Sequence, residues 1–452
     1  MGAQTTSIQA AIPRSRALPI AAIPAAITLA FLGWLIGSGN WKIFGIWTLE
    51  STTGRATGFG DLAFITATAS CFSTENAGGA IDLDTCDPYG RPYTPYGLIP
   101  GKILAFFGLG FEQTWILGIT LMVIWVLSVF WLTYTLTKNW RRGNTELAVA
   151  IALITLLAIS PTAMLAVERG TLDILVVALA TFGLLGFTTS GKFAPARKWL
   201  SSFALFTAVA LKYFPLGLFA PFFAPKRWSV PASIGAAVTA LFLLLNLDNL
   251  RSATQIAMAD SLSTTRIMFS STTGLVTWLV EDPLAFNPPP DQILNETTLQ
   301  TVGALLFAAL TIGLVVLLRG VSKKELSMPP TTPNLPWYLI VGGSFSLSIP
   351  YFLGASNDYR LILLLLPLTG LLTWIGTTRK SALRLTLRIV ATATTIAALT
   401  GASMIPNDSG FIVPKAILVF GDACLALTLA FGAALFINAW ITQASTKRRV
   451  HE

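Results

Sequence analysis

Acidic and basic side chains interrupt strongly apolar stretches of this sequence at five separate places. The stretches are GFGDLAFI with Asp61, CDPYGRPYTPYG with Asp87 and Arg91, ERGTLD with Glu168, Arg169 and Asp173, LKYFP with Lys212 and Tyr213, and NDYRLILLLLP with Asp358, Tyr359 and Arg360. Arginine and lysine bind phosphate groups, and a carboxylate can accept a proton from an attacking hydroxyl group. Together these residue types favour group transfer from a phosphate-linked donor to a hydroxyl acceptor.

Each stretch also has a purely structural explanation. Asp61 and Asp358 could cap helices, and DPYGRP is typical of a turn whose tyrosines lie at a membrane interface. Lys212 could extend toward the membrane surface, and Arg169 and Asp173 could pair on one helix face because they are four residues apart. Five such coincidences are harder to accept than one, so we favour a shared polar pocket.

The composition shows which kind of protein must position these residues. Charged residues make up 11% of the 452 residues and apolar residues 54%, and the mean hydropathy is +0.68. A soluble domain has about 25% charged residues. The composition therefore indicates an integral membrane protein, and without repeats or low-complexity linkers we expect a single domain over residues 1–452.

The apolar runs predict an all-α, polytopic bundle of about ten to twelve transmembrane helices, because a helix needs about 20 apolar residues to cross a bilayer. Predicted spans are 17–38, 113–137, 146–167, 171–189, 230–247, 299–319, 336–353, 360–376, 386–404 and 414–441. Two shorter runs, 199–211 and 214–225, flank Lys212 and form either two short crossings or a re-entrant hairpin. The first span resembles a signal peptide, but no small-residue cleavage site follows it, so we expect it to be retained.

The net charge of +9 follows from membrane topology and does not require a nucleic-acid partner. With the N-terminus in the cytoplasm, twenty of the 30 basic residues fall on the inner side, beside only Glu146, Glu325 and Glu452. These twenty are Arg14, Arg16, Lys138, Arg141, Arg142, Lys192, Arg197, Lys198, Lys226, Arg227, Arg319, Lys323, Lys324, Arg379, Lys380, Arg384, Arg388, Lys447, Arg448 and Arg449. The positive-inside rule then predicts a multi-pass protein of the plasma membrane with both termini cytoplasmic.

This topology brings all five charged stretches to the extracytoplasmic ends of the predicted spans. Residues 39–112 form the first outside loop, and residues 248–297 form a second large one that is either a lid over the site or a plain connection. A lipid phosphate would lie at this depth, with its tail among the helices. The predicted donor is therefore a lipid-linked phosphate, bound by Arg91, Arg169, Lys212 and Arg360.

Several other chemistries are excluded or disfavoured. The single histidine, His451, lies in the cytoplasmic tail, which excludes Ser-His-Asp hydrolysis and histidine-based zinc sites. The sequence has no glycine-rich phosphate loop. Asp82 and Asp84, with Asp87 nearby, have the spacing of a divalent-metal motif; we favour a solvated acidic turn and predict no metal site, although weak calcium or magnesium binding stays open.

The three cysteines divide between a loop and a span. Cys71 and Cys86 lie in the first outside loop, where an oxidising compartment would let them form a disulfide worth about 3 kcal/mol. The alternative is two free thiols. Cys424 lies within the last predicted span.

In their order along the chain, the motifs GD, CDPYGRPYTPYG, ERGTLD, LKYFP and NDYRL resemble polyprenyl-phosphate-dependent glycosyltransferases of the GT-C superfamily. The resemblance is to family 87, which includes mycobacterial-type mannosyltransferases, and it covers most of the chain. The family often has asparagine where Thr171 stands here, and some relatives use a histidine near the acceptor that this chain lacks. The resemblance implies a GT-C-like helical bundle with loops on its outer face.

The resemblance also implies a reaction. A sugar, mannose or a pentose such as arabinose, would pass with inversion from polyprenyl phosphate to a cell-envelope glycolipid or polysaccharide. Asp61 corresponds to the catalytic base, and Arg169, Lys212 and Arg360 would hold the donor phosphate. The sequence identifies neither the sugar nor the acceptor. Two alternatives stay open: a transporter or flippase of a lipid-linked sugar, and a non-catalytic subunit of an envelope assembly.

Overall fold

The computed structural model describes ten segments of the chain. They are residues 13–38, 59–76, 95–188, 190–225, 227–247, 296–322, 335–352, 358–378, 381–400 and 415–451. Within these segments every regular element is a helix, and no strand occurs. The predicted all-α fold of a polytopic membrane protein is confirmed.

Six helical segments are long and apolar enough to cross a membrane by themselves in the described part of the chain. They are Ser15–Ser38, Phe111–Asn139, Thr301–Gly320, Arg360–Thr377, Ser381–Thr400 and Phe420–Gln443. Four of them lie within single α-helices: α1 (Arg14–Ser38), α12 (Glu296–Ser322), α15 (Ser381–Thr400) and α16 (Lys415–His451). The other two each combine a 3-10 helix with the α-helix that follows it, namely η2 (Phe111–Gln113) with α4 (Thr114–Asn139) and part of η5 (Asp358–Leu364) with α14 (Leu365–Thr377). Large apolar side chains on several of them are exposed, among them Leu127, Trp131 and Leu305, as expected for surfaces that face lipid.

The predicted span 146–167 is broken into two helices, α5 (Asn144–Ala158) and α6 (Pro161–Arg169), which meet at 42°. Pro161 has no backbone N–H to continue the ladder of α5, and the Oγ atom of Ser160 accepts a hydrogen bond from the backbone N–H of Ala163. The proline therefore starts a new helix. Counted as one crossing, this pair brings the long apolar spans to seven.

Four shorter elements follow: α7 (Asp173–Gly186), α8 (Ala194–Leu211), the 3-10 helix η3 (Phe214–Phe223) and α9 (Val230–Leu245). With 10 residues at a rise of about 2.0 Å each, η3 is about 20 Å long and too short for a hydrocarbon layer of about 30 Å. Its backbone is buried against α13 (Leu335–Phe352), where a Cβ atom on Gly217 would lie 2.2 Å from the carbonyl carbon of Phe345. Irregular backbone at membrane depth is tolerated where protein covers it.

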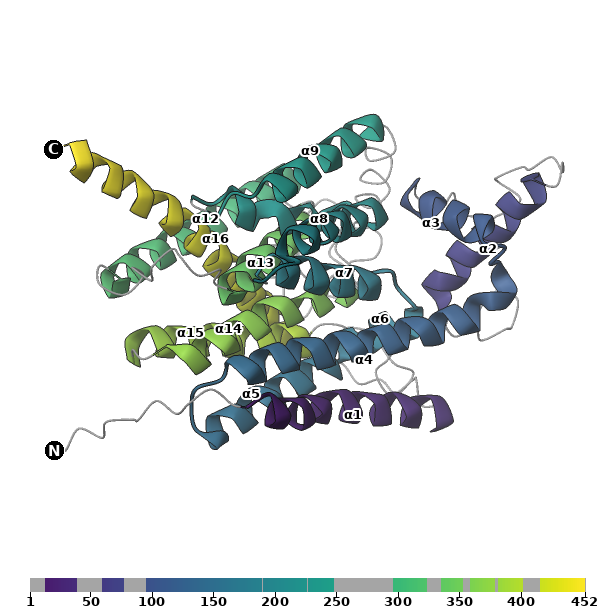
Figure 1. Cartoon of the computed structure of the whole chain (residues 1–452), viewed down its shortest axis with the longest axis horizontal. Coiled ribbons are helices and arrows are strands. Elements are labelled where there is room, and N and C mark those ends of the chain that lie inside the picture. Colours follow the sequence, from purple (N-terminus) through teal and green to yellow (C-terminus); the bar gives the residue numbers. More distant parts are fainter. Residues whose placement is uncertain are drawn as a thin grey trace.

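The first predicted outside loop, 39–112, contains helices of its own. They are α2 (Gly60–Asn76), α3 (Pro95–Phe106) and η2 (Phe111–Gln113). In Figure 1, α2 and α3 lie together on the right, beside the start of α4, while the end of α16 lies on the left. The second predicted outside loop, 248–297, falls almost entirely outside the described residues, so its lid role stays a prediction.

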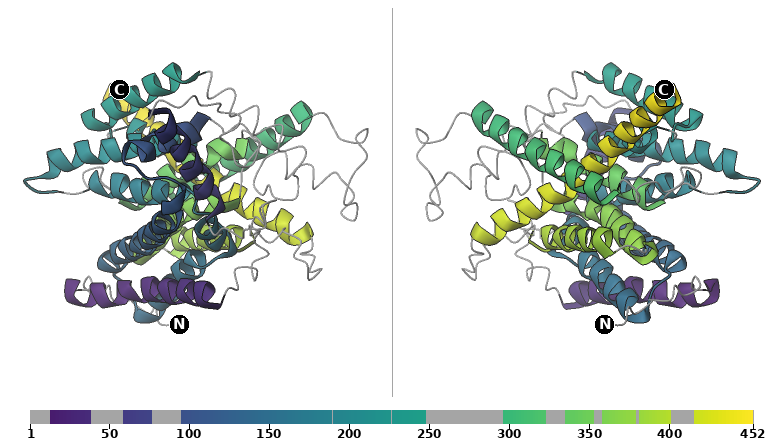
Figure 2. Two further views of the ribbon diagram at one scale, coloured as in Figure 1. Left: turned by 90° about the vertical axis from the view of Figure 1, so that its right-hand side faces the viewer. Right: turned by 90° about the vertical axis from the view of Figure 1, so that its left-hand side faces the viewer.

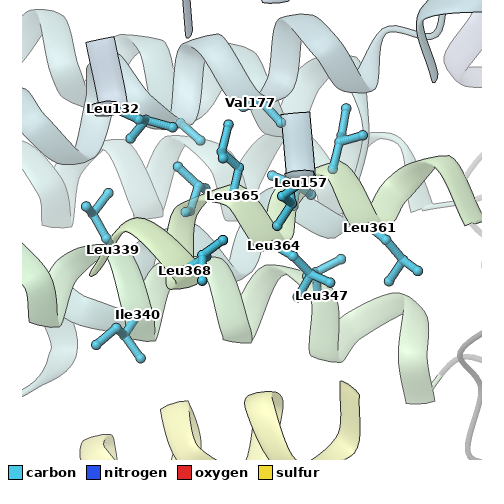
Figure 3. Close-up of a cluster of buried hydrophobic side chains, with 14 of the residues drawn as sticks. Leu132, Leu157, Val177, Leu339, Ile340, Leu347, Leu361, Leu364, Leu365 and Leu368 are labelled. Atoms are coloured by element: carbon cyan, nitrogen blue, oxygen red, sulfur yellow. The ribbon is translucent and has the colours of Figure 1, made fainter. Parts of the chain in front are cut away.

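The core is built around α13, α14 and η5 (Asp358–Leu364). Leu361, Leu364, Leu365 and Leu368 are fully or almost fully buried and lie near Leu347 of α13, as Figure 3 shows. On one side of the bundle, α12 crosses α16, with which it is in contact (Figure 2). The apolar run that begins at Arg360 is therefore a central element, and it carries Arg360 to the end of the bundle where α6 and α7 meet.

Candidate functional site

Six of the predicted site residues gather at one end of the bundle. We call this group the Asp61 site and define it as Asp61, Glu168, Arg169, Asp173, Lys212 and Arg360. They come from α2, α6, the start of α7, the residue after α8, and η5. Contacts between these elements bring the group together: α2 packs on α6, and η5 packs on both α6 and α7.

Phe59 attaches α2 to the bundle. Its backbone N–H donates to the carbonyl oxygen of Glu168 at 2.7 Å, and its ring packs edge-on against Trp115 at a centroid distance of 5.3 Å. The ring lies directly over Gly118, where a Cβ atom would come within 2.4 Å of it. Phe59 has a φ angle of 64°, a left-handed conformation that is costly for a bulky residue. Tertiary contacts therefore hold Phe59, two residues before Asp61, in this left-handed conformation.

Asp61 lies in the first turn of α2 and forms an ion pair with Arg169. The Nε and Nη2 atoms of Arg169 both lie 2.8 Å from the same carboxylate oxygen, Oδ1. The pair is partly accessible, since the side chains of Arg169 and Asp61 are 28% and 19% exposed. A ligand that approaches this end of the bundle can therefore reach both partners.

The structural alternative in which Arg169 pairs with Asp173 on one helix face does not occur. Such a pair needs one continuous helix, but α6 ends at Arg169 and α7 begins at Asp173. Between them Gly170 adopts a φ angle of 62°, a left-handed cap that terminates α6. The break directs the two side chains to different partners, since Arg169 pairs with Asp61 and Asp173 pairs with Lys212.

Asp173 and Lys212 form the second ion pair, with 3.4 Å between Lys212 Nζ and Asp173 Oδ2. The Asp173 side chain is completely buried, whereas that of Lys212 is 23% exposed. Lys212 lies just after α8 in extended conformation, and its backbone N–H still bonds to the carbonyl of Ala208. Leaving the helix at this residue carries the Lys212 side chain to the first turn of α7.

Three buried polar groups in the ERGTLD stretch lack hydrogen-bond partners among the described residues. They are Oε2 of Glu168, Oγ1 of Thr171 and both carboxylate oxygens of Asp173, whose contact with Lys212 is an ion pair and not a hydrogen bond. Buried polar atoms are almost always satisfied by protein, water or ligand. The stretch therefore presents acceptors suited to the hydroxyl groups of a ligand.

Arg360, the last member of the Asp61 site, has its guanidinium carbon 5.3 Å from the centre of the Phe214 ring. Phe214 follows Tyr213, and the two rings meet edge to face at a centroid distance of 6.3 Å. The LKYFP and NDYRL stretches are thus in contact, as predicted. The half-buried Tyr213 contributes a ring beside the basic residues.

The remaining predicted residues lie outside the described part of the structure. These are Asp87 and Arg91 of the first loop, Cys86, and the side chains of Cys71, Asp358 and Tyr359. The disulfide between Cys71 and Cys86 and the phosphate contact of Arg91 stay predictions. Among the described residues, no group of three or more histidine, cysteine, aspartate or glutamate side chains is placed to hold a metal ion.

The prediction missed a buried acid in the last span. Asp422 in α16 is 4% exposed and interacts electrostatically with Tyr351 of α13, which is 2% exposed. An aspartate inside an apolar run is itself a signal of function in membrane helices. It was missed because the sequence reasoning considered only charges near the ends of spans.

Comparisons with known proteins identify no relative of this chain. No protein-family model matches the chain, and searches of curated proteins and of solved structures find no match either. Chemically, the Asp61 site combines three basic groups with three carboxyl groups, and the buried hydroxyl group of Thr171 lies in the same ERGTLD stretch. Such a site can hold an anion, accept hydrogen bonds from a polyol and take up a proton.

Proposed function

We propose that the protein is an integral-membrane glycosyltransferase that moves a sugar from polyprenyl phosphate to a hydroxyl group of a cell-envelope acceptor. The observation that carries this proposal is the contact between Asp61 and Arg169, residues 108 positions apart, beside buried carboxylates without hydrogen bonds. A candidate base, a candidate phosphate ligand and candidate sugar ligands thus lie together. The resemblance of the sequence motifs to the GT-C superfamily supports the same reaction.

The donor phosphate is held by Arg169, Lys212 and Arg360, with Arg91 as a further predicted ligand. Two of these bases, Arg169 and Lys212, are paired with Asp61 and Asp173. Phosphate oxygens compete well for arginine because they accept two parallel hydrogen bonds from a guanidinium group. We infer that donor binding draws Arg169 away from Asp61 and leaves the Asp61 carboxylate beside the bound phosphate.

Asp61 then acts as the general base. The acceptor hydroxyl gives its proton to Asp61 while its oxygen forms a bond to the anomeric carbon of the sugar. The bond between that carbon and the phosphate oxygen breaks, and its electron pair leaves with polyprenyl phosphate. Attack from the face opposite the leaving phosphate inverts the configuration, and the leaving group needs no acid because a phosphate already carries the negative charge well.

The ERGTLD stretch positions the sugar. Glu168 and Asp173 accept hydrogen bonds from sugar hydroxyl groups, and Thr171 offers one more polar contact. A site that binds hydroxyl groups through buried polar atoms discriminates strongly against sugars that lack them. The same stretch follows α6, so sugar recognition and the phosphate ligand Arg169 are on one short segment.

The topology of the reaction follows from the charge pattern of the loops. The protein would lie in the plasma membrane with both termini in the cytoplasm and the Asp61 site on the extracytoplasmic face. A lipid-linked donor then presents its phosphate and sugar at the membrane surface while its tail lies against the exposed apolar faces of the helices.

A turnover assay tests the proposal. Purified protein is incubated with radiolabelled polyprenyl-phosphate mannose or arabinose and a crude envelope acceptor, and labelled product is quantified. Asp61→Asn keeps the shape of the side chain and should lower turnover about 10²- to 10⁴-fold, the usual contribution of a general base. The matched control is Glu112→Gln, which removes the charge of an exposed acid near the same end of the bundle.

The outcomes separate the three functions. Loss of turnover in Asp61→Asn alone supports the transferase. Undiminished turnover in that variant would refute Asp61 as the base. If no labelled product forms but donor crosses a liposome bilayer, the protein is a transporter; if neither occurs, the motifs serve a structural subunit.

A further inference from the structure

A second group of polar residues surrounds a cavity of about 330 Å³ far from the Asp61 site. The cavity lies between the C-terminal end of α4, the end of α7, the start of α8 and the start of α13. Its polar lining comprises Lys138 and Arg197 together with the hydroxyl-bearing residues Tyr134, Thr135, Thr188 and Ser190. None of the described residues that line it is acidic.

The two bases approach the cavity from different helices. Lys138 is in the last turn of α4 and lies over the ring of Tyr134, with 5.7 Å between Nζ and the ring centre. Arg197 is in the first turn of α8 and is exposed. Two like charges repel each other when nothing lies between them, so an anion between Lys138 and Arg197 lowers the electrostatic energy of both.

Apolar surface continues from the cavity along the outside of the bundle. On α4, Leu127 and Trp131 are 58% and 49% exposed and stand one turn apart, leading to Thr135 and Lys138. On α8, Leu200 and Phe203 are 57% and 65% exposed and continue from Arg197. An anion with apolar tails would place its charge in the cavity and its tails along these two stripes.

We propose that this cavity binds the headgroup of an anionic phospholipid of the surrounding bilayer. The phosphate lies between Lys138 and Arg197, the hydroxyl group of Ser190 donates to its oxygens, and the acyl chains follow the exposed faces of α4 and α8. Basic pockets between transmembrane helices bind anionic headgroups in this way, and aromatic residues such as Trp131 favour the same depth. The proposal is independent of the transfer reaction at the Asp61 site.

Native mass spectrometry of the detergent-purified full chain tests the site. Delipidated protein is titrated with phosphatidylglycerol, with phosphatidylcholine and with inorganic phosphate. We expect phosphatidylglycerol to bind and the other two probes to bind at least about tenfold more weakly, because one lacks net charge and the other lacks tails. Lys138→Gln combined with Arg197→Gln should weaken phosphatidylglycerol binding by about tenfold or more.

A matched control removes the same charge nearby. Lys192→Gln combined with Lys198→Gln neutralises two lysines around the start of α8 that do not line the cavity, and it should leave binding unchanged. Ser190→Trp fills the cavity without changing charge and should also abolish binding, which covers the case that the double glutamine variant misfolds. Equal losses in the Lys138/Arg197 and Lys192/Lys198 variants would overturn the proposal, as would equal binding of phosphatidylcholine or full binding in Ser190→Trp.

Discussion

Arg142 and Arg169 lie at opposite ends of the bent pair α5–α6, and they meet different kinds of partner. Arg142 donates from Nε to the carbonyl of Ile375 at 2.7 Å and from Nη2 to the carbonyl of Thr378. These carbonyls belong to the end of α14, where helix geometry leaves acceptors unsatisfied. Arg142 therefore joins the α4–α5 connection to α14 through partners that are fixed in the backbone.

Arg169 instead meets a carboxylate on a separate helix, at a partly exposed position. Around Arg142, Glu146 completes the network by pairing with both Arg142 and Arg388. Around Arg169, Glu168 and Asp173 retain buried oxygens without hydrogen bonds. The difference separates charges that hold helices together from charges whose partners a ligand would replace under the proposed function.

The electrostatic surroundings of Arg142 fit the structural role. Burial, and then the neighbouring positive charge of Arg384, lowers the pKa of the Arg142 guanidinium from its ordinary value, while Glu146 opposes this effect. Since arginine stays protonated even so, Arg142 keeps its donors at every physiological pH. The link between α5 and α14 should therefore be insensitive to pH between about 5 and 9.

The largest expected effect is at Lys212. Lys212→Met leaves the fully buried Asp173 without its cation, and the free energy of unfolding should fall by about 3–5 kcal/mol. Adding Asp173→Asn in the same chain should recover most of this loss, while donor binding stays weak in both variants. Thermal unfolding in detergent and donor binding measure the two effects, with Lys102→Met on α3 as the exposed lysine control.

Recovery of donor binding together with stability in the double variant would contradict a phosphate-binding role for Lys212. It would mean that the Lys212–Asp173 pair only supports the fold, as Arg142 does.

Arg360→Ala provides the second test of phosphate binding, and it should weaken donor binding about tenfold or more because one charge-assisted contact is lost.

Arg142→Met should have the next largest effect, and only on stability. Losing charged hydrogen bonds to two buried carbonyls should lower the free energy of unfolding by about 1.5–3 kcal/mol. Turnover per folded molecule should stay the same. Arg141→Met is the matched control, because its exposed side chain is adjacent and its backbone N–H keeps the bond to Gly376.

Gly118→Ala should lower both the free energy of unfolding and the affinity of the Asp61 site for the donor. The added Cβ atom lies 2.4 Å from the Phe59 ring, and displacing that ring should cost about 1–3 kcal/mol. Because the Phe59 N–H holds the carbonyl of Glu168, donor affinity should fall as well. The control is Gly33→Ala in α1, where an added Cβ atom would have no described atom within 4 Å apart from the backbone of its own helix. Unchanged donor affinity in Gly118→Ala would argue that Phe59 does not position the site.

Arg388→Gln should have the smallest effect. Its pair with Glu146 is solvent-accessible, with side chains 51% and 32% exposed, so its loss should cost about 0.2–1 kcal/mol. This small difference from the unmodified protein should vanish in about 1 M salt, where the Debye length is about 3 Å. A salt-independent loss of several kcal/mol would show that Glu146 depends on Arg388 as well as on Arg142.

The sequence alone determined the class of fold and the approximate position of most helices. Apolar runs of sufficient length predict membrane helices because the hydrocarbon layer has a fixed thickness, and the helices α1, α4, α13 and α16 fall where those runs predict. The sequence also singled out Asp61, Arg169, Lys212 and Arg360 as candidate site residues, because charges are costly in such runs and are conspicuous there. The break at Pro161 and the length of η3 were less predictable, since local backbone chemistry competes there with hydropathy.

Which charged residues form ion pairs depends on the tertiary structure. Spacing along one helix would allow a pair between Arg169 and Asp173, but Gly170 ends α6. Arg169 pairs instead with Asp61 of α2, and Asp173 pairs with Lys212 at the end of α8. An ion pair forms between side chains that packing brings within about 4 Å, whatever their separation in sequence. Sequence spacing fixes that distance within a single helix, whereas between helices the distance depends on the contacts of the whole bundle.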